Sequence, residues 1–482
     1  MVYFLKYEVR SIQKYIYSSS KLKEIERASQ FVSTILKKVL EEACDHFHYI
    51  YDKNAILSDD FQFDEKNFDF QIAFEGGGSL FCFLNVKEEE DIHKFNQFIG
   101  YLFLKETYSL RVCYAFVKKT DDINADRKNL NNKASKLKSR MPDACLQPSL
   151  PITMCSKENS FPLSEITKST EGGDKPTVRK ITRESKCKLV QVFSGTGTKN
   201  LEEIRDFGED SMLGLVHIDV NDLGIAIKEF FEKNKTSDYC KAINLSRKVS
   251  NAINEKYNKA FNDFILEYPF SDNDKPYRII INSGDDITFI IKGIYAIDVV
   301  AKFLKELNKS SFFDDEKKIT ACAGIAFIKS HFPYNKGYDI AEALCESAKR
   351  KAKKESGNYC AFDYYICQNG MISTVEEDEA KFKNLYSKPY FVNRGQHKDD
   401  DYEELIERIK DLASESMTIS KIKEIRNAYE KGDDYIEMVM KRISSRLGEK
   451  HKLIPFDDND KNHAKYYDAS TLMDFYMPYK ED

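Results

Sequence analysis

The order of predicted strands and helices occurs twice along this chain, and this repeat constrains the fold more than any other feature. Each copy has the order strand, helix, helix, strand, tight turn, strand, helix, strand, and the copies cover residues 1–140 and 210–370. The two copies share little residue identity, so the repeat is one of structure. Because strands alternate with helices and each copy contains a β-hairpin, the pattern predicts an α+β fold with two related domains.

Two further segments lie outside the repeat. Residues 141–209 hold five of the eleven prolines and the pair Gly172-Gly173, which predicts an irregular connector. Residues 371–482 are highly charged and carry amphipathic periods, which predict an α-helical C-terminal domain. With 482 residues, of which 41% are hydrophobic, the chain is long enough to bury several cores.

Composition excludes several classes of protein. A net charge of −5 argues against a protein that coats nucleic acid through a broad basic surface, although local basic pockets remain compatible with it. No stretch of eighteen apolar residues occurs, and the first residues lack the pattern of a signal peptide, so we expect no membrane span and a cytoplasmic location. The eleven cysteines occur singly and without a CxxC pair, which predicts buried free thiols.

Residues 277–293, YRIIINSGDDITFIIKG, predict a hairpin of two buried strands. At its tip lie Ser283, Gly284, Asp285 and Asp286, and Gly284 supplies the positive φ that a tight turn needs. Two adjacent carboxylates at the end of apolar strands repel each other unless a divalent cation or solvent neutralises them. Adjacent residues point to opposite faces of a regular strand, so the turn must twist for both acids to reach one cation.

A third carboxylate is predicted to lie beside this hairpin. The strand at residues 213–220 is apolar except for His217 and Asp219, which share one face because side chains alternate along a strand. We expect this strand to pair with the next one along the chain, which brings Asp219 to the hairpin tip. Three carboxylates of this kind hold two divalent cations for attack on a phosphoryl group. We therefore predict Asp219, Asp285 and Asp286 as catalytic metal ligands, with the Val220 carbonyl as a neutral ligand.

Two other features are compatible with nucleotide binding. Lys349 and Lys353 share a face at the end of the helix predicted at residues 338–355, where they either complement the helix dipole or clamp a triphosphate. In the first copy, the hairpin tip Gly76, Gly77 and Gly78 lacks acids. Bare glycines either form a tight turn or let backbone N–H groups approach a phosphate or a base. Asp222 lies where a helix is predicted to begin, and an N-cap is a sufficient role for it.

Several motifs, taken in order, resemble a known family. HIDVNDLG, SGDD and TACAGIAFIKSHFPYNKGYDIAEALCESAKRKAK are similar to the second palm domain of the large subunit of type III CRISPR effector complexes. IQKYIYSSSKLKEIERAS and EGGGSLFCFL resemble the first palm domain of that subunit. The resemblance covers both repeats, and the helical C-terminal segment is compatible with the family's C-terminal domain.

The resemblance implies two ferredoxin-like palm domains and the synthesis of cyclic oligoadenylates from ATP, with Mg²⁺ or Mn²⁺, in antiviral defence. Asp219, Asp285 and Asp286 match the family's metal-binding acids. Ser283 stands where the family usually has glycine, and a small residue still fits the turn. The resemblance also assigns nucleotide contacts, and these fall on Asn221, Ser283, Gly284, Gly76, Gly77, Gly78, Lys349 and Lys353.

The sequence departs from the family in two respects. The family usually begins with an HD nuclease domain and often carries zinc-binding cysteine pairs between its palms, and neither pattern is present here. We therefore predict no DNase activity and expect a relative that acts alone, by self-association, or with CRISPR subunits and guide and target RNA. A downstream effector would detect its product.

Two other functions compete with this one. A non-catalytic palm scaffold of an RNA-guided complex would not need to retain all three acids. A diguanylate cyclase of the GGDEF type is disfavoured by the duplicated palm and by the second Asp in place of Glu.

Overall fold

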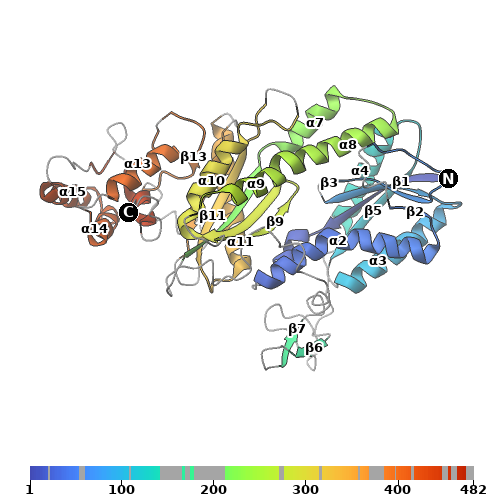
Figure 1. Cartoon of the computed structure of the whole chain (residues 1–482), viewed down its shortest axis with the longest axis horizontal. Coiled ribbons are helices and arrows are strands. Elements are labelled where there is room, and N and C mark those ends of the chain that lie inside the picture. The colour runs from blue at the N-terminus through green and yellow to red at the C-terminus, as the bar shows by residue number, and fades with distance from the viewer. Residues whose placement is uncertain are drawn as a thin grey trace. The chain divides into compact units, whose positions relative to one another are not determined.

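The computed structural model of the chain is shown in Figure 1. It describes residues 1–19, 22–53, 60–76, 78–107, 110–141, 165–168, 174–177, 212–270, 276–313, 317–355, 359–367, 385–396, 398–413, 417–447, 454–456 and 464–473. The chain divides into two compact units. The first comprises Met1–Ser194, Asp222–Asn258 and Ser283–Asp285, and the second comprises Gly195–Asn221, Lys259–Asn282 and Asp286–Asp482. The division into four domains made from the sequence stays a prediction.

The first unit is built on a five-stranded sheet with the order β2-β3-β4-β1-β5. Its central strand, β1, pairs antiparallel with both β4 and β5. β3 and β4 form the predicted glycine-rich hairpin, in which Gly76 lies opposite Ser79 and Gly78 has a φ of 70°. The strands are β1 (Val2–Arg10), β2 (Tyr51–Asp52), β3 (Phe70–Gly76), β4 (Ser79–Asn85) and β5 (Arg111–Lys118).

Helices cover both faces of this sheet because the side chains of β1 alternate between them. On one face, the Tyr7 hydroxyl donates to Asn96 of α3 over 2.7 Å. On the other face, Phe4 packs edge-on against Tyr239 of α8, with ring centroids 5.9 Å apart. The helices of the first unit are α1 (Ile12–Ile16), α2 (Leu22–Phe47), α3 (Glu89–Thr107), α4 (Ile123–Arg140), α7 (Leu223–Lys233) and α8 (Tyr239–Ile253).

The buried guanidinium of Arg247 anchors α8 to β3. It donates to the carbonyl oxygens of Ala73 (2.7 Å) and Ile72 (3.3 Å), where the pairing of β3 with β4 shifts register between Ile72 and Phe74. A register shift leaves backbone carbonyls without strand partners, and a buried Arg can satisfy them. α8, which follows Asp219 in the chain, therefore belongs to the core of the first unit.

The second unit contains a six-stranded sheet with the order β13-β12-β11-β8-β10-β9. Its strands are β8 (Met212–Val220), β9 (Tyr277–Ser283), β10 (Asp286–Lys292), β11 (Ala321–Lys329), β12 (Ala361–Ile366) and β13 (Tyr390–Phe391). The four strands β9-β10-β8-β11 repeat the order β3-β4-β1-β5 of the first unit, so the duplication and the two ferredoxin-like palm folds predicted from the sequence are confirmed.

One predicted strand pairing was wrong. We expected β8 to pair with the next strand along the chain, β9, but β8 pairs antiparallel with β10 and β11, and β9 lies at the edge. The physical reason is the hairpin. Its tight turn requires β10 to pair antiparallel with β9, whereas the long helical connection after β8 can pass over one strand. β10 therefore occupies the position beside β8.

Two glycines let helices approach this sheet on opposite faces. A Cβ on Gly214 of β8 would lie 2.6 Å from Ala296 of α10, and a Cβ on Gly324 of β11 would lie 1.9 Å from the carbonyl oxygen of Ala341 in α11. α10 thus packs on one face and α11 on the other. The helices here are α9 (Ala260–Glu267), α10 (Gly293–Leu307) and α11 (Tyr334–Lys354).

The helical stretch between α7 and β9 is interrupted. Between α8 and α9 the chain forms a π-helix, Asn254–Lys259, and short π-helical segments of this kind frequently occur at functional sites. β12 and β13 were not predicted from the sequence.

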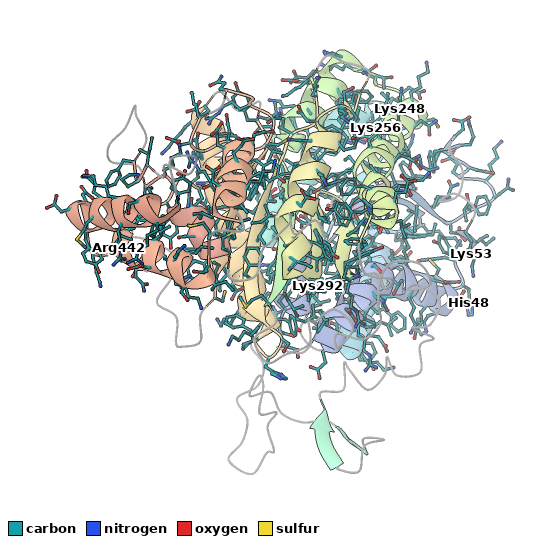
Figure 2. All side chains as sticks on the ribbon, turned by 60° about the vertical axis from the view of Figure 1, so that its left-hand side comes forward. His48, Lys53, Lys248, Lys256, Lys292 and Arg442 are labelled. Atoms are coloured by element: carbon teal, nitrogen blue, oxygen red, sulfur yellow. The ribbon has the colours of Figure 1, made fainter. Side chains whose placement is uncertain are left out.

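The described part of the C-terminal segment is helical, as predicted. It contains α13 (Tyr402–Leu412), α14 (Ile419–Tyr429), α15 (Asp433–Leu447) and α16 (Tyr467–Leu472). Arg442, labelled on α15 in Figure 2, forms an ion pair with Glu424 of α14. Beneath such surface pairs, Ile425 of α14 and Val439 of α15 are fully buried, so apolar packing holds these helices together.

Other expectations concern cysteines, the membrane and the connector. The eight described cysteines are free thiols, and all except Cys240 are buried, as predicted. Within the described residues, no helix combines the length and the apolar character needed to cross a membrane. Most of the predicted connector lies outside the described residues. Its described part is a small hairpin of β6 (Glu165–Lys168) and β7 (Asp174–Thr177).

Candidate metal centre

Two adjacent cross-strand pairs on the face of the second sheet that α11 covers form the centre of the candidate site. Asp219 of β8 lies opposite Asp286 of β10, and His217 lies opposite Thr288. All four side chains point to this face because each strand contributes positions two residues apart. One ligand atom each from His217, Asp219 and Asp286 lies within 4.8 Å of the other two. The structure therefore confirms that His217 and Asp219 share a face and that the hairpin meets the end of β8.

His217 is the buried member of this group. Its side chain is 4% exposed, its Nδ1 lies 3.1 Å from the Thr288 hydroxyl, and its Nε2 lies 3.9 Å from Asp286 Oδ1. Burial, followed by the positive charge of Lys349, lowers the pKa of His217 to about 4. Its imidazole is therefore neutral at pH 7. The sequence placed His217 on the same face as Asp219, two residues earlier, but did not identify it as a ligand.

Lys349 of α11 pairs with Asp219. Its ammonium donates to Asp219 Oδ2 and lies 3.8 Å from Glu346. Burial alone would lower the pKa of Lys349, but the hydrogen bond and the charge of Asp219 outweigh burial and raise this pKa above its usual value. Lys349 thus carries a full positive charge directly on one of the predicted metal ligands. Lys353, one turn later, is exposed.

The hairpin turn is as tight as predicted. Ser283 ends β9, Asp286 begins β10, and Gly284 has a φ of 67°, a conformation that side chains rarely adopt. Asp285 is exposed and is not part of the His–Asp–Asp group found among the described residues. Its assignment as a metal ligand stays a prediction. The side chain of Asn258, in the π-helix, donates to the carbonyl of Gly284 over 3.2 Å, a contact that the sequence did not indicate.

The residues that follow Asp219 are held in different ways. Val220 is buried and lies opposite Ala321 of β11. The Asn221 amide donates to the carbonyl of Tyr359 over 3.4 Å. Asp222 is the N-cap residue of α7, with a φ of 52°, but its side chain makes no capping hydrogen bond. Asp222 therefore occupies the N-cap position without performing the usual side-chain role.

Of the first-palm glycines assigned to nucleotide binding, Gly76 ends β3 and Gly78 lies in the turn that follows. Gly77 lies outside the described residues. The nucleotide contacts predicted for Gly76, Gly78, Asn221, Ser283 and Gly284 stay predictions.

The donor set fits a divalent cation. Two carboxylates supply hard oxygen atoms, and a neutral imidazole supplies a nitrogen atom. Two ligands about 2.1 Å from a common ion lie about 3 to 4.2 Å apart, and the 3.9 Å between His217 Nε2 and Asp286 Oδ1 falls in that range. The sheet therefore brings His217 and Asp286 to a spacing that one ion can share, with Asp219 within 4.8 Å of both.

Comparisons with known proteins agree with this geometry. Residues 212–357 match the family model described as Cas10/Cmr2, second palm domain. No curated protein matches the sequence significantly.

Among solved structures, the chain is similar to Csm1 from T. onnurineus, with 14% identity and a TM-score of 0.53 over 99% of this chain and 70% of that chain. Two Csm1-Csm4 cassettes, one in complex with AMPPNP and one apo, give TM-scores of 0.52 and 0.51. Each is 14% identical and covers 98% of this chain and 69% of that chain. At this identity, the likeness concerns the fold. Residues 212–357 therefore match a second palm domain of the Cas10/Cmr2 type.

Proposed function

We propose that this protein is a metal-dependent nucleotidyltransferase that makes cyclic oligonucleotides, of which cyclic oligoadenylate is the best candidate, from ATP. One observation carries the proposal. Asp219 and Asp286 lie opposite each other on neighbouring strands, with ligand atoms within 4.8 Å of each other and of His217. Two carboxylates in such a pair repel each other, and a bound cation reduces that repulsion.

In this proposal, Asp219 and Asp286 hold the cation, Mg²⁺ or Mn²⁺, and the neighbouring Asp285 and the Val220 carbonyl remain predicted additional ligands. When bound, divalent cations lower the pKa of an attacking ribose hydroxyl and neutralise charge on the triphosphate. The sheet contributes rigidity, because each ligand stands at a defined register on paired strands. The two carboxylates therefore need little rearrangement for cation binding.

Lys349 has two successive partners in the proposed site. Without a cation, its ammonium neutralises Asp219. Once Asp219 directs its charge to a cation, the ammonium can turn to the phosphates of ATP, as lysines do in other phosphate sites. Lys353 extends this positive face by one helical turn and is open to solvent.

The proposed partners follow from the similar structures. Csm1 is found there in a cassette with Csm4, in one case with AMPPNP. We propose a comparable subunit and an adenine nucleotide for this chain, with guide and target RNA as candidate activators. Self-association without further subunits is the alternative, and a separate effector would bind the product.

A non-catalytic scaffold remains the second candidate function. The observation that favours it is the Lys349–Asp219 pair, which neutralises Asp219 without a cation. A scaffold would use this pair only to hold α11 against β8. The two functions make opposite predictions about product formation.

The test incubates the full chain with each NTP and with Mg²⁺ or Mn²⁺, with and without candidate RNA activators, and analyses the products by mass spectrometry. We expect cyclic or linear oligonucleotides from ATP. The double variant Asp285→Ala, Asp286→Ala should form none while keeping the wild-type circular dichroism spectrum. If no NTP mixture yields an oligonucleotide, the scaffold function is correct. If the double variant retains wild-type activity, the proposed metal site is wrong.

A further inference from the structure

The side chain in the candidate site that the sequence did not identify is His217. A palm site built only from carboxylates offers oxygen ligands, which suit Mg²⁺. Here the imidazole of His217 lies next to the two acids, and one ligand atom of each of the three side chains lies within 4.8 Å of the others. This nitrogen atom changes which cation the site should prefer.

The environment of His217 leaves one ring nitrogen for a ligand. Nδ1 lies 3.1 Å from the hydroxyl of Thr288, which is fully buried. Nε2 faces Asp286 Oδ1 at 3.9 Å, which is beyond hydrogen-bonding distance, and has no other polar partner among the described residues. The side chain as a whole is 4% exposed, so its position is fixed by the core around it. A ring nitrogen 3.9 Å from one carboxylate, in a group with two, is placed where it can share an ion with them.

Thr288 and Tyr338 fix the orientation of the ring. Thr288 holds Nδ1, and the Tyr338 ring from α11 packs edge-on, with centroids 5.4 Å apart. Histidine ligands commonly donate their other ring N–H to an oxygen, which sets the tautomer and presents the free nitrogen to the metal. The Thr288 hydroxyl stands where such an acceptor is needed.

We propose that His217 Nε2 is a direct ligand of the catalytic cation and makes the site selective for Mn²⁺ over Mg²⁺. Mg²⁺ prefers an octahedron of oxygen atoms and gives up water reluctantly, whereas imidazole suits the first-row transition metals. This inference rests on the proposed metal site of Asp219 and Asp286. It goes further, because it assigns a specificity-determining residue and names the cation.

The experiment measures Mn²⁺ and Mg²⁺ binding to the full chain by calorimetry, and the Mn²⁺ environment by pulsed EPR. The wild type should show coupling between Mn²⁺ and one imidazole nitrogen. His217→Leu should remove this coupling and lower the ratio of Mn²⁺ to Mg²⁺ affinity by at least about tenfold, because loss of a ligand costs no less than loss of an outer-shell partner. Mg²⁺ affinity should change less than about twofold in that variant.

Two further variants test whether the loss of Mn²⁺ affinity is specific to His217. Thr288→Val removes the partner of Nδ1, and it should weaken Mn²⁺ binding less than His217→Leu does. His331→Ala removes an exposed histidine outside the site, and it should leave both affinities and the nitrogen coupling unchanged. If His217→Leu fails to fold, His217→Gln takes its place, because its amide can still bond Thr288.

The outcomes separate this inference from the proposed function. Absence of nitrogen coupling in Mn²⁺-loaded wild type, or an unchanged affinity ratio in the His217 variant, overturns the inference even if product forms. Nitrogen coupling without any product from ATP supports the inference and rejects the nucleotidyltransferase. If neither cation binds the wild type, both are wrong.

Discussion

The five-stranded and six-stranded sheets have four structurally equivalent positions, and the side chains at these positions differ in chemistry. In the second unit, Asp219 faces Asp286 across the strands and His217 faces Thr288. In the first unit, the equivalent positions give Glu8 facing Ser79 and Lys6 facing Phe81. Each pair lies where the central strand meets the second strand of a hairpin. The duplicated fold therefore presents one set of side chains that suits a cation and one that does not.

Both units place a lysine from the following helix on the acid of the central strand. Lys138 of α4 donates to Glu8 over 2.6 Å, as Lys349 of α11 does to Asp219. In the first unit, Lys6 adds a second ammonium 3.5 Å from Glu8. Burial would raise the pKa of Glu8, but the two lysines outweigh it and hold this pKa below its usual value.

The charges at the equivalent positions differ between the two units. In the first unit, one carboxylate has two ammonium partners and no second acid, so its charge is already balanced. In the second unit, two carboxylates lie opposite each other, and Lys349 pairs with one of them. The fold is common to both units, and the side chains at these positions distinguish them.

The largest effect should come from Asp286→Ala, compared with Ser79→Ala at the equivalent position. Loss of Asp286 removes one of two carboxylate ligands, so we expect product formation to fall by at least about a hundredfold. Ser79→Ala should leave the rate within about twofold. Product is measured by mass spectrometry at a fixed Mn²⁺ concentration. Equal losses in both variants would show that the two hairpins do not differ in the way proposed.

A second comparison concerns how closely the helices approach the sheets. Gly324 lies opposite His217, and its counterpart in the first unit, opposite Lys6, is Ala115. A Cβ at Gly324 would collide with the backbone of α11, so Gly324→Ala should destabilise the protein by about 3 kcal/mol or more. Ala115→Gly should cost only about 1 kcal/mol.

Chemical denaturation of the two variants measures this difference. The transition that reports the second unit should move in Gly324→Ala, and wild-type stability of that variant would show that α11 can shift away from the sheet. Mn²⁺ binding should fall together with stability, because α11 also carries Tyr338, whose ring packs against His217.

The third comparison tests the two lysines. Lys349→Gln removes the ammonium that competes for Asp219, so Mn²⁺ should bind more tightly while the KM for ATP rises, each by about tenfold. Lys138→Gln should change neither value by more than about twofold, because no second acid faces Glu8. Calorimetry gives the Mn²⁺ affinity and steady-state kinetics give the KM. A weaker Mn²⁺ affinity in Lys349→Gln would mean that Lys349 supports the site instead of competing for it.

The smallest effect is a gain of function. The double variant Lys6→His, Ser79→Asp rebuilds the His–acid–acid set in the first unit. It should raise the Mn²⁺ stoichiometry by one, with weaker affinity than the natural site, because a Phe occupies the position equivalent to Thr288. Unchanged stoichiometry would show that features beyond these positions are needed to bind a cation.

Much of the candidate site could be predicted from local sequence. The apolar runs around Ser283–Asp285 indicated the hairpin, and Gly284 has the positive φ expected of it. Alternation along β8 placed His217 and Asp219 on one face, as observed. These features depend on a few neighbouring residues, and local backbone geometry determines them.

Other features depend on contacts between distant segments, and local patterns did not indicate them. The pairing of β8 with β10 follows from the order of strands in the whole sheet. The position of Lys349 on Asp219 depends on how closely α11 packs on β11, which Gly324 permits. The role of Asn258 depends on a π-helix within a stretch that has the period of an ordinary α-helix.

The sequence by itself determined that the chain contains two related α+β repeats and that the second carries acids at its hairpin tip, whereas the tip of the first is rich in glycine. Only the tertiary structure decided that Asp286 is the acid in register with Asp219, and that the ring of the buried His217 lies next to both acids. The physical reason is the separation along the chain over which each interaction acts. Periodicity and turn chemistry act over a few residues, whereas a metal centre requires atoms from separate strands within about 4 Å of each other.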